Sequence, residues 1–197
     1  MLKRYHTKGI LEAGCDEAGR GCLAGPVVAA AVILDPKYRI DGLDDSKKLT
    51  ERKREALRPI IESKALAWAV GLVDHKGIDK INILNASFLA MHRALDELDI
   101  RPDELLIDGN RFKTYKDIPH HCMIKGDGRF LSIAAASILA KTHRDEIMAE
   151  LHHRYPNYHW DRNKGYPTKA HRQGIREFGA CPLHRTSFRL LPEVLEV

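Results

Sequence analysis

Four acidic residues stand beside glycines at three separate places in the chain, and their side chains are of the type that binds metal ions. Asp16 and Glu17 lie in the stretch Gly-Cys-Asp-Glu-Ala-Gly-Arg-Gly over residues 14–21, Asp108 precedes a glycine, and Asp127 lies between two glycines. Carboxylate oxygens are preferred ligands of hard divalent cations such as Mg²⁺ and Mn²⁺. Without a cation, two carboxylates about 4 Å apart repel by roughly 1 kcal/mol in water and by about 4 kcal/mol at a lower effective dielectric. If these acids converge, a divalent metal is the best explanation for the cluster.

The elements that must position these acids are read from apolar runs, hydrophobic periodicity and turn residues. The pattern predicts strands over residues 10–16, 27–34, 66–74, 104–108 and 121–125, and helices over residues 51–63, 79–98, 132–153 and 169–178. Asp16, Asp108 and Asp127 then stand at or just after strand ends, where sites form in open α/β sheets. The alternative is that they are ordinary turn aspartates, because Asp is common before glycine.

Asp16 and Glu17 present a geometric difficulty, because adjacent residues of a regular strand point to opposite faces of the sheet. Both can serve one metal site only if the strand distorts there, or if Glu17 acts through its backbone carbonyl or a metal-bound water. Gly14 and Gly19 flank the pair and would permit such a distortion.

The order of the elements indicates an α/β domain with a mixed sheet, since strands cluster early and then alternate with helices. The 197 residues predict one domain, with residues from about 153 to 197 forming a helical or irregular C-terminal extension. The longest apolar runs are far too short to cross a bilayer, and no secretory signal follows the first residues. The four cysteines form no C-x-x-C pair, and we expect reduced thiols in a cytoplasmic protein, with Cys15 and Cys22 as small core residues.

The charge of the chain favours a polyanionic partner. Its formal net charge is +5 and its pI about 9.0. Basic residues are concentrated over residues 162–176, where Tyr166 stands among them. Basic side chains with an exposed aromatic suit phosphate contact and packing on sugars or bases. A solvated helix with a half-buried tyrosine explains the same stretch equally well.

Other catalytic motifs are absent or do not fit. The glycines between residues 19 and 25 have the wrong spacing for a dinucleotide-binding loop and precede a strand rather than a helix. The sequence contains no phosphate-binding P-loop, no G-x-S-x-G nucleophile motif and no H-E-x-x-H zinc motif.

Several longer strings resemble those of the bacterial ribonuclease HII family, the type 2 ribonucleases H. The first is Asp-Glu-Ala-Gly-Arg-Gly over residues 16–21, continued by Leu-Ala-Gly-Pro-Val-Val from residue 23. Further strings follow in order and extend the resemblance over nearly the whole chain. They are Asp-Ser-Lys-Lys-Leu from residue 45, Ile-Asp-Gly-Asn from 107, Lys-Gly-Asp from 125, the alanine-rich stretch 131–141, Asn-Lys-Gly-Tyr-Pro-Thr from 163 and Leu-His-Arg-Thr-Ser-Phe from 183.

The resemblance implies a ribonuclease H-like fold, with a mixed five-stranded sheet flanked by helices and a C-terminal helical extension that helps to bind substrate. It implies an endoribonuclease that cuts on the 5′ side of a ribonucleotide embedded in duplex DNA, and RNA in RNA/DNA hybrids, leaving a 3′-hydroxyl and a 5′-phosphate. The implied cofactor is Mg²⁺ or Mn²⁺, with two ions in catalysis, and the expected enzyme is a monomer without membrane association.

The same resemblance implies roles for individual residues. The four acids Asp16, Glu17, Asp108 and Asp127 would bind metal and form the catalytic site. The substrate-binding residues would be Gly19, Arg20, Gly21, Ser46, Lys47, Asn110, Lys164 and Tyr166. The glycines would let backbone groups approach the 2′ position closely, which is what distinguishes RNA from DNA. Arg20 would hold a phosphate, and Tyr166 would pack against the sugar of the next deoxynucleotide.

Two positions depart from the family pattern. Cys22 stands where many members have proline, and Gly-Arg-Phe over residues 128–130 follows Asp127 where a small residue and lysine are more common. Neither change removes an acid. At this point two alternatives remain open: another two-metal nuclease of the same fold that acts on DNA structure, and a basic nucleic-acid-binding module whose acids only cap strands.

Overall fold

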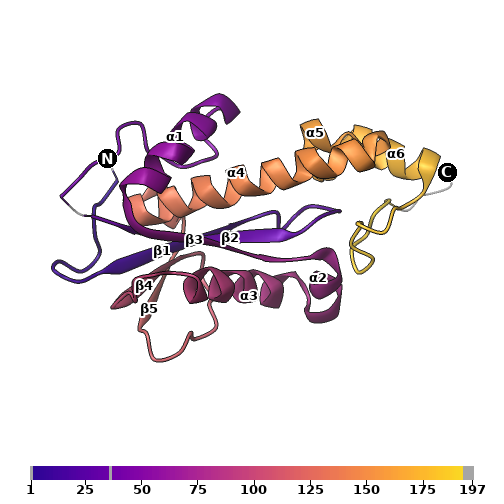
Figure 1. The fold of residues 1–197 in the computed structure, drawn as a ribbon. Coiled ribbons are helices and arrows are strands. Elements are labelled where there is room, and N and C mark those ends of the chain that lie inside the picture. Colours follow the sequence, from indigo (N-terminus) through magenta and orange to yellow (C-terminus); the bar gives the residue numbers. More distant parts are fainter. Residues whose placement is uncertain (1, 36, 193–197) are drawn as a thin grey trace.

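The computed structural model describes residues 2–35 and 37–192 (Figure 1). The strands are β1 (Glu12–Ala18), β2 (Val27–Leu34), β3 (Ala65–Val73), β4 (Glu104–Asp108) and β5 (His120–Met123). The α-helices are α1 (Glu51–Lys64), α2 (His75–Ile81), α3 (Ile83–Asp96), α4 (Leu131–Arg154), α5 (Trp160–Asn163) and α6 (Lys169–Phe178). Two short 3₁₀ helices are η1 (Gly126–Gly128) and η2 (Pro156–Tyr158).

The described residues form one five-stranded sheet in the order β3-β2-β1-β4-β5. β1, β2 and β3 pair antiparallel, whereas β4 pairs parallel with both β1 and β5, so the predicted mixed sheet is confirmed. In Figure 1 helices α1 and α4 cover one face of the sheet, and α2 and α3 cover the other. This arrangement places β1 in the centre, with its carboxyl end between the carboxyl end of β4 and the amino end of β2.

The core is built from the alternation of side chains along β2. Ala29, Ala31 and Ile33 join the cluster under α3, while Ala30 and Val32 join the cluster under α4. All five side chains are fully buried, as expected of a strand that is covered on both faces. Small residues dominate this strand, and they allow both helices to approach the sheet closely.

Helix α4 comes closest to the sheet at Gly14. A Cβ atom at this position would lie 2.3 Å from the carbonyl carbon of Ser132 and 2.4 Å from the backbone nitrogen of Ile133. Gly14 is therefore required for helix packing, rather than for the strand distortion that was one of the alternatives left open by the sequence. The close contact sets the height of α4 above β1 and with it the position of every side chain that α4 turns toward the strand.

Two element boundaries differ from the sequence-based predictions. The predicted strand 10–16 is observed as β1, which continues through Ala18 in register with β2, so Asp16 lies inside the strand and does not end it. The predicted helix 79–98 is interrupted at Asn82, where φ is 65°, and is observed as α2 and α3. The Asn82 side chain accepts a hydrogen bond from Asn85 N at 3.1 Å and so caps the second helix, a local competition with the helical backbone that periodicity does not reveal.

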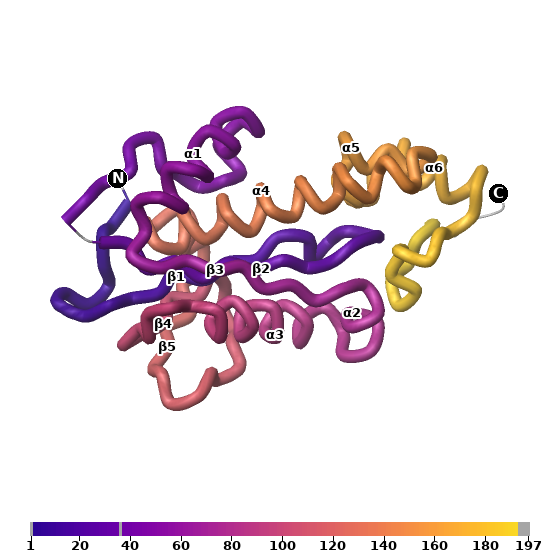
Figure 2. Tube along the Cα trace, in the orientation of Figure 1, coloured from indigo at the N-terminus to yellow at the C-terminus, as the bar shows by residue number. Residues whose placement is uncertain are grey.

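The C-terminal extension packs against the end of α4 and against the loop that follows β1. Its buried cluster joins Tyr158, Trp160 and Ile175 to Leu23 and Met148. Figures 1 and 2 show the extension in orange and yellow beyond the far end of α4. Cys22, at the start of this contact region, is fully buried, as is Cys15, which confirms the predicted core roles of both thiols. None of the described helices is long and apolar enough to cross a membrane.

A buried pair of histidines holds the extension together. His171 Nδ1 bonds to the carbonyl oxygen of Tyr166 at 2.9 Å, and its Nε2 lies 3.0 Å from Trp160 Nε1 and 3.1 Å from His184 Nε2. His184 Nδ1 accepts a hydrogen bond from Cys181 N at 3.0 Å. This pattern uses both imidazoles in the neutral form. Burial lowers the pKa of His171, and burial lowers that of His184 to about 4.

The histidine pair predicts an acid-sensitive fold. The folded-state pKa of His184 is depressed below its ordinary value of 6.5, so between pH 6.5 and about 4 the unfolded chain binds more protons. The free energy of unfolding should therefore fall as the pH is lowered through this window, by up to about 3 kcal/mol for His184 alone. Denaturant unfolding of His184→Gln and of wild type at pH 7 and pH 5 measures this contribution. The exposed His153→Gln should retain the wild-type pH dependence, and an equally steep loss in His184→Gln would contradict the assignment.

Candidate active site

Three of the predicted acids converge at the centre of the sheet. Asp16 and Asp108 stand side by side, because the parallel ladder between β1 and β4 runs up to the pair Cys15–Ile107, one residue before them. Asp127 joins them from η1. One carboxylate oxygen from each of the three lies within 4.8 Å of the others. The predicted convergence of acids that are up to 111 residues apart in sequence is thus present in the structure.

The turn after β5 places Asp127 beside Asp108. Lys125 adopts φ of 54°, which reverses the chain, and Gly126 N then donates to Asp108 Oδ1 at 2.7 Å. Asp127 Oδ1 accepts a hydrogen bond from Gly128 N at 3.0 Å, and its Oδ2 lies 3.0 Å from Lys47 Nζ. Asp127 therefore stands in a 3₁₀ turn rather than at the end of the strand. The following residues, 128–130, still leave the carboxylate in the cluster despite their departure from the family pattern.

Burial and mutual repulsion disfavour the charged forms of Asp16 and Asp108, and the surrounding hydrogen bonds only partly offset this effect. Burial raises the pKa of Asp16 well above its usual range, and the charges of Glu17 and Asp108 raise it further. Burial and the charge of Asp127 raise the pKa of Asp108. Asp16 and Asp127 are only 4% and 3% exposed, so water screens their repulsion weakly. The set stores a repulsion that a bound cation would relieve.

Glu17 lies on the rim of the cluster. β1 remains paired residue for residue with β2 at this point, so the distortion considered from the sequence does not occur. Glu17 Oε1 lies 3.2 Å from Arg20 Nη1, and burial raises the pKa of Glu17 although Arg20 opposes the shift. Its side chain lines the same pocket as Asp16 and Asp108, outside the group of three close carboxylates.

The pocket around the acids collects most of the predicted substrate-binding residues. Its lining includes Asp16, Glu17, Gly19, Arg20, Gly21, Ser46, Lys47, Asp108 and Tyr166, together with Ser137 and Lys141 from α4. The cavity measures about 240 Å³. Two predicted residues lie elsewhere. Asn110 is exposed beyond β4, and Lys164 Nζ bonds to Asp161 O at 2.7 Å and lies 3.2 Å from Glu51 Oε1 in a neighbouring groove.

Sequence reasoning missed the α4 side chains that support Asp16. Ser137 donates a hydrogen bond to Asp16 that counteracts the rise of its pKa, and its hydroxyl lies 2.9 Å from that of Ser46. Lys141 Nζ pairs with Asp145 Oδ2 at 2.6 Å at the edge of the pocket. These residues lie within or just after the alanine-rich stretch that carries the family resemblance, but nothing in their spacing identifies a role.

Two buried arginines hold the loop that follows β1. Arg185, which is fully buried, bonds through its guanidinium to the carbonyl oxygens of Gly19, Arg20, Gly25 and Pro26 at 2.7–3.2 Å. Burial lowers the pKa of Arg185 to about 10. Arg185 stands in the string Leu-His-Arg-Thr-Ser-Phe from residue 183, but nothing in that string predicts this role.

Arg144 is the second of these arginines and comes from α4. It bonds to the carbonyl oxygens of Ala24, Pro26 and Lys164, so it ties the same loop to the segment that carries Tyr166. Gly19 has φ of +96°, and a Cβ there would lie 2.0 Å from Arg144 Nε. Gly21 by contrast faces open space. Gly19 is therefore needed for the packing of the arginine, and Gly21 leaves room for a ligand.

The donor set fits a hard divalent cation. All close ligands are carboxylate oxygens, they come from three separate elements, and their mutual repulsion is relieved only by positive charge. Asp16, Asp108 and Asp127 are the residues that would hold it, with Glu17 beside them. The sheet is mixed and flanked by helices, and the acidic cluster lies next to the loop 19–21, which presents backbone groups and the basic side chain of Arg20. This combination of fold and site is that of the ribonuclease H-like nucleases.

Comparison with known proteins identifies the family within this class. Residues 13–191 match the family model of ribonuclease HII, and the chain belongs to this family. A ribonuclease HII of Phocaeicola vulgatus is 65% identical over 191 residues, which cover 97% of this chain and 95% of that protein. One of Parabacteroides distasonis is 64% identical over 195 residues, covering 99% and 98%. The chain is accordingly a ribonuclease H, an endoribonuclease that hydrolyses RNA in RNA/DNA hybrids.

Solved structures support the same fold. Ribonuclease H2 of Pyrococcus horikoshii superposes with a TM-score of 0.76 at 27% identity, covering 92% of this chain and 95% of that one. A ribonuclease HIII solved in complex with Mn²⁺ gives a TM-score of 0.71 at 21% identity, covering 92% and 68%. The second likeness concerns the fold alone.

Removing one acid should stabilise the metal-free protein. Asp108→Asn keeps the acceptor for Gly126 N but removes a charge that Asp16 and Asp127 repel, so the metal-free free energy of unfolding should rise by about 1 kcal/mol or more. The added stability that Mg²⁺ gives to the wild type should shrink in the variant. Thermal unfolding with EDTA and with Mg²⁺ measures both effects, and the exposed Asp99→Asn serves as the control. Destabilisation under both conditions would show that Asp108 is structural.

The arginine support of the loop gives a second prediction. Lysine in place of Arg185 keeps the charge but cannot reach several carbonyl oxygens at once, and each buried acceptor left alone costs about 1–3 kcal/mol. We expect a lower Tm and, well below that Tm, a loss of cleavage on the order of 100-fold, because the loop beside the acids shifts. The exposed Arg176→Lys should behave as wild type. Wild-type cleavage by a destabilised Arg185→Lys would show that the arginine supports the fold but not the site.

Proposed function

We propose that the enzyme hydrolyses the phosphodiester bond on the 5′ side of a ribonucleotide embedded in duplex DNA, in addition to RNA within hybrids, and leaves a 3′-hydroxyl and a 5′-phosphate. The observation that carries the proposal is the pocket that Asp16, Glu17 and Asp108 share with the loop 19–21. A single ribonucleotide is distinguished from DNA only by a close contact to its 2′-hydroxyl. The loop beside Asp16 offers backbone without a side chain at Gly21 and is held rigidly by Arg185.

The acids Asp16, Asp108 and Asp127, with Glu17 beside them, are proposed to hold two Mg²⁺ or Mn²⁺ ions. Such ions, when bound, activate a water and stabilise the leaving oxygen in an in-line displacement. The contribution of the chain is to hold three carboxylates close together despite their repulsion. Hydrogen bonds from Glu17 N and Ser137 to Asp16, and from Gly126 N to Asp108, favour the charged forms and orient the oxygens.

The basic and aromatic residues of the pocket are proposed to position the nucleic acid. The Arg20 side chain is half exposed beside Glu17, and the Lys47 side chain projects to solvent beside Asp127. Both are placed to contact backbone phosphates. Tyr166 is 38% exposed, with the Arg144 guanidinium 5.9 Å from its ring centroid, and offers an aromatic face to a sugar. Through Tyr166 the C-terminal extension takes part in substrate binding.

The remaining predicted contacts receive narrower roles. Ser46 is buried and its hydroxyl bonds to Ser137, so we assign it to the support of Asp16 rather than to a phosphate. The Lys164 ammonium is engaged by Glu51 and Asp161, and the Lys164 carbonyl accepts from Arg144, which indicates a structural role. A contact of Asn110 with the substrate stays a prediction. We also propose a cytoplasmic enzyme that acts as a monomer and as a single domain over residues 1–197.

Cleavage of three matched duplexes tests the proposal: all DNA, DNA with one internal ribonucleotide, and a full RNA/DNA hybrid, each in Mg²⁺ and in Mn²⁺. We expect cutting on the 5′ side of the lone ribonucleotide and throughout the RNA of the hybrid, with no cutting of the all-DNA duplex. Asp16→Asn should abolish both activities, because it removes a buried ligand. Cleavage of the all-DNA duplex would instead favour a nuclease that acts on DNA structure.

A second arm of the same experiment addresses Tyr166. Tyr166→Ala should reduce cleavage at the single ribonucleotide more than it reduces duplex binding, since packing on one sugar positions the scissile phosphate. Tyr38 is 66% exposed and lies outside the pocket lining, so Tyr38→Ala is the matched control. Equal losses of binding and cleavage in Tyr166→Ala would limit the tyrosine to supporting the fold.

A further inference from the structure

A second group of metal-ligand side chains lies at the opposite end of the sheet from the acids. It consists of His6 from the N-terminal segment, Glu104 at the start of β4 and His121 in β5. One ligand atom from each lies within 4.8 Å of the other two. Glu104 Oε1 is in direct contact with His121 Nε2, Glu104 Oε2 is 3.8 Å from His6 Nδ1, and the two imidazole centroids are 4.5 Å apart.

The central carboxylate of this group is buried and incompletely satisfied. Glu104 is only 6% exposed, and among residues 2–35 and 37–192 no hydrogen-bond donor reaches its Oε2. Buried polar atoms are rarely left in this state, so each instance requires an explanation. The unpartnered Oε2 lies 3.8 Å from His6 Nδ1, and a cation bound between these two atoms would give the oxygen a partner.

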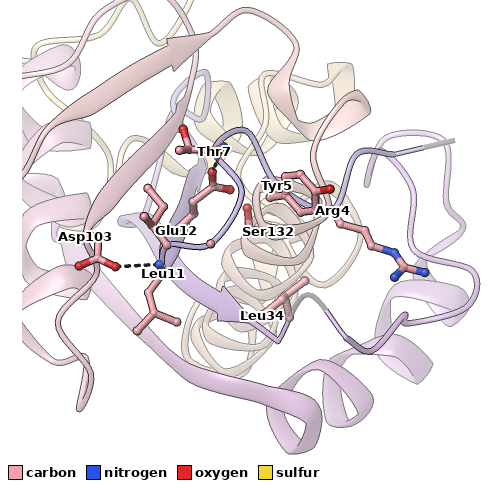
Figure 3. Close-up of a pocket in the computed structure, with 10 residues that line it drawn as sticks. Arg4, Tyr5, Thr7, Leu11, Glu12, Leu34, Asp103 and Ser132 are labelled. Carbon is pink, nitrogen blue, oxygen red and sulfur yellow. Dashed lines mark hydrogen bonds between the residues drawn. The ribbon is translucent and has the colours of Figure 1, made fainter.

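A neighbouring acid sharpens the contrast. Glu12 pairs with Glu104 in the ladder between β1 and β4 and is 7% exposed. Its carboxylate is satisfied, because it accepts hydrogen bonds from the backbone nitrogens of His6 and Thr7; Figure 3 shows the bond to Thr7. Two buried carboxylates thus lie side by side, one fully bonded by the N-terminal segment and one not. The same segment that bonds Glu12 carries His6 to Glu104.

We propose that His6, Glu104 and His121 form a binding site for a borderline divalent transition metal of the Zn²⁺ class. Imidazole nitrogen with carboxylate oxygen is a donor set that Zn²⁺ binds well, whereas Mg²⁺ favours oxygen ligands alone. Zn–N and Zn–O bonds of about 2.0–2.2 Å at tetrahedral angles separate ligand atoms by about 3.3–3.6 Å. The observed 3.8 Å between His6 Nδ1 and Glu104 Oε2 is close to this separation, whereas His121 Nε2, now in direct contact with Glu104 Oε1, would have to move away to reach it.

The surroundings of the site suit a bound metal. The side chains of His6 and His121 are 35% and 43% exposed, so the ion can enter from solvent and a water can occupy a fourth position. On the protein side, the buried ring of Phe130 packs edge-on against His6, with 6.1 Å between centroids.

The proposed site is separate from the catalytic acids. Glu104 and Asp108 are four residues apart on β4, or roughly 13 Å along an extended strand. Its position indicates a structural role. Lys3 N donates to Arg129 O at 2.8 Å, and Leu131 N donates to Lys3 O at 2.9 Å, so the N-terminal segment is bound to the residues between Asp127 and α4. A metal at His6 would fasten this segment to β4 and β5.

Metal titration of the full-length protein tests the proposal. Calorimetry with ZnCl₂ in excess Mg²⁺, in the wild type and in Asp16→Asn, should show one Zn²⁺ site that survives the loss of the catalytic acid. His6→Gln and His121→Gln should each weaken this site more than about 100-fold, since even outer-shell changes cost about 10–100-fold. Co²⁺ bound at the site should give the strong visible absorption of four-coordinate nitrogen and oxygen ligation, and Zn²⁺ should displace it.

Matched variants make the outcome decisive. The exposed His153→Gln should bind Zn²⁺ as the wild type does. His6 lies on the exposed N-terminal segment, so His6→Gln should keep the wild-type Tm without metal and lose the rise in Tm that Zn²⁺ produces. Absence of Zn²⁺ binding to the wild type in excess Mg²⁺, or unchanged binding in both histidine variants, would overturn the proposal. Neither result would bear on cleavage, which rests on the other acids.

Discussion

The close packing of α4 on β1 is the constraint on which the active site depends. It is possible only because Gly14 has no side chain where the backbone of Ser132 and Ile133 lies. Any larger residue would lift the helix, and overpacking of this kind typically costs about 1–3 kcal/mol. With the helix at this height, Ser137 reaches Asp16 and Arg144 reaches the loop beyond the strand. The close contact at Gly14 therefore affects the support of both Asp16 and the loop that follows β1.

The second constraint is the electrostatic repulsion among the carboxylates that the fold brings together. Burial and mutual repulsion raise the pKa of Asp16 and of Asp108. The same close packing of carboxylates that would bind a metal therefore destabilises the metal-free site. Backbone and hydroxyl donors around the acids offset part of this cost. The two buried arginines do not pair with these acids. Arg144 and Arg185 are surrounded by carbonyl oxygens and hold the chain without neutralising the acids.

The two ends of the sheet resemble each other in one respect. At each end, carboxylates from β1 and β4 lie side by side. The buried Asp16 lies beside the half-buried Asp108 at one end, and the buried Glu12 beside the buried Glu104 at the other. Parallel pairing of the two strands brings like residues together whenever both carry an acid at the same register. The other side chains of each group then determine which metal ion it suits. At the catalytic end all ligand atoms are oxygens, whereas at the other end two imidazoles accompany one carboxylate.

The sequence by itself determined the mixed sheet, most of the elements and three of the acids, because apolar runs, helical periodicity and glycines near aspartates are local signals. Local signals could not show that β1 runs past Asp16 or that Asn82 divides a helix, since both outcomes depend on strand pairing and on a side-chain cap. Only the tertiary structure brought Arg144, Arg185 and Ser137 to the site. Their roles rest on contacts between residues 91 to 166 positions apart, which no spacing along the chain records. The tertiary structure also separated Lys164 from the pocket, because the fold places Glu51 Oε1 3.2 Å from the Lys164 ammonium in a neighbouring groove.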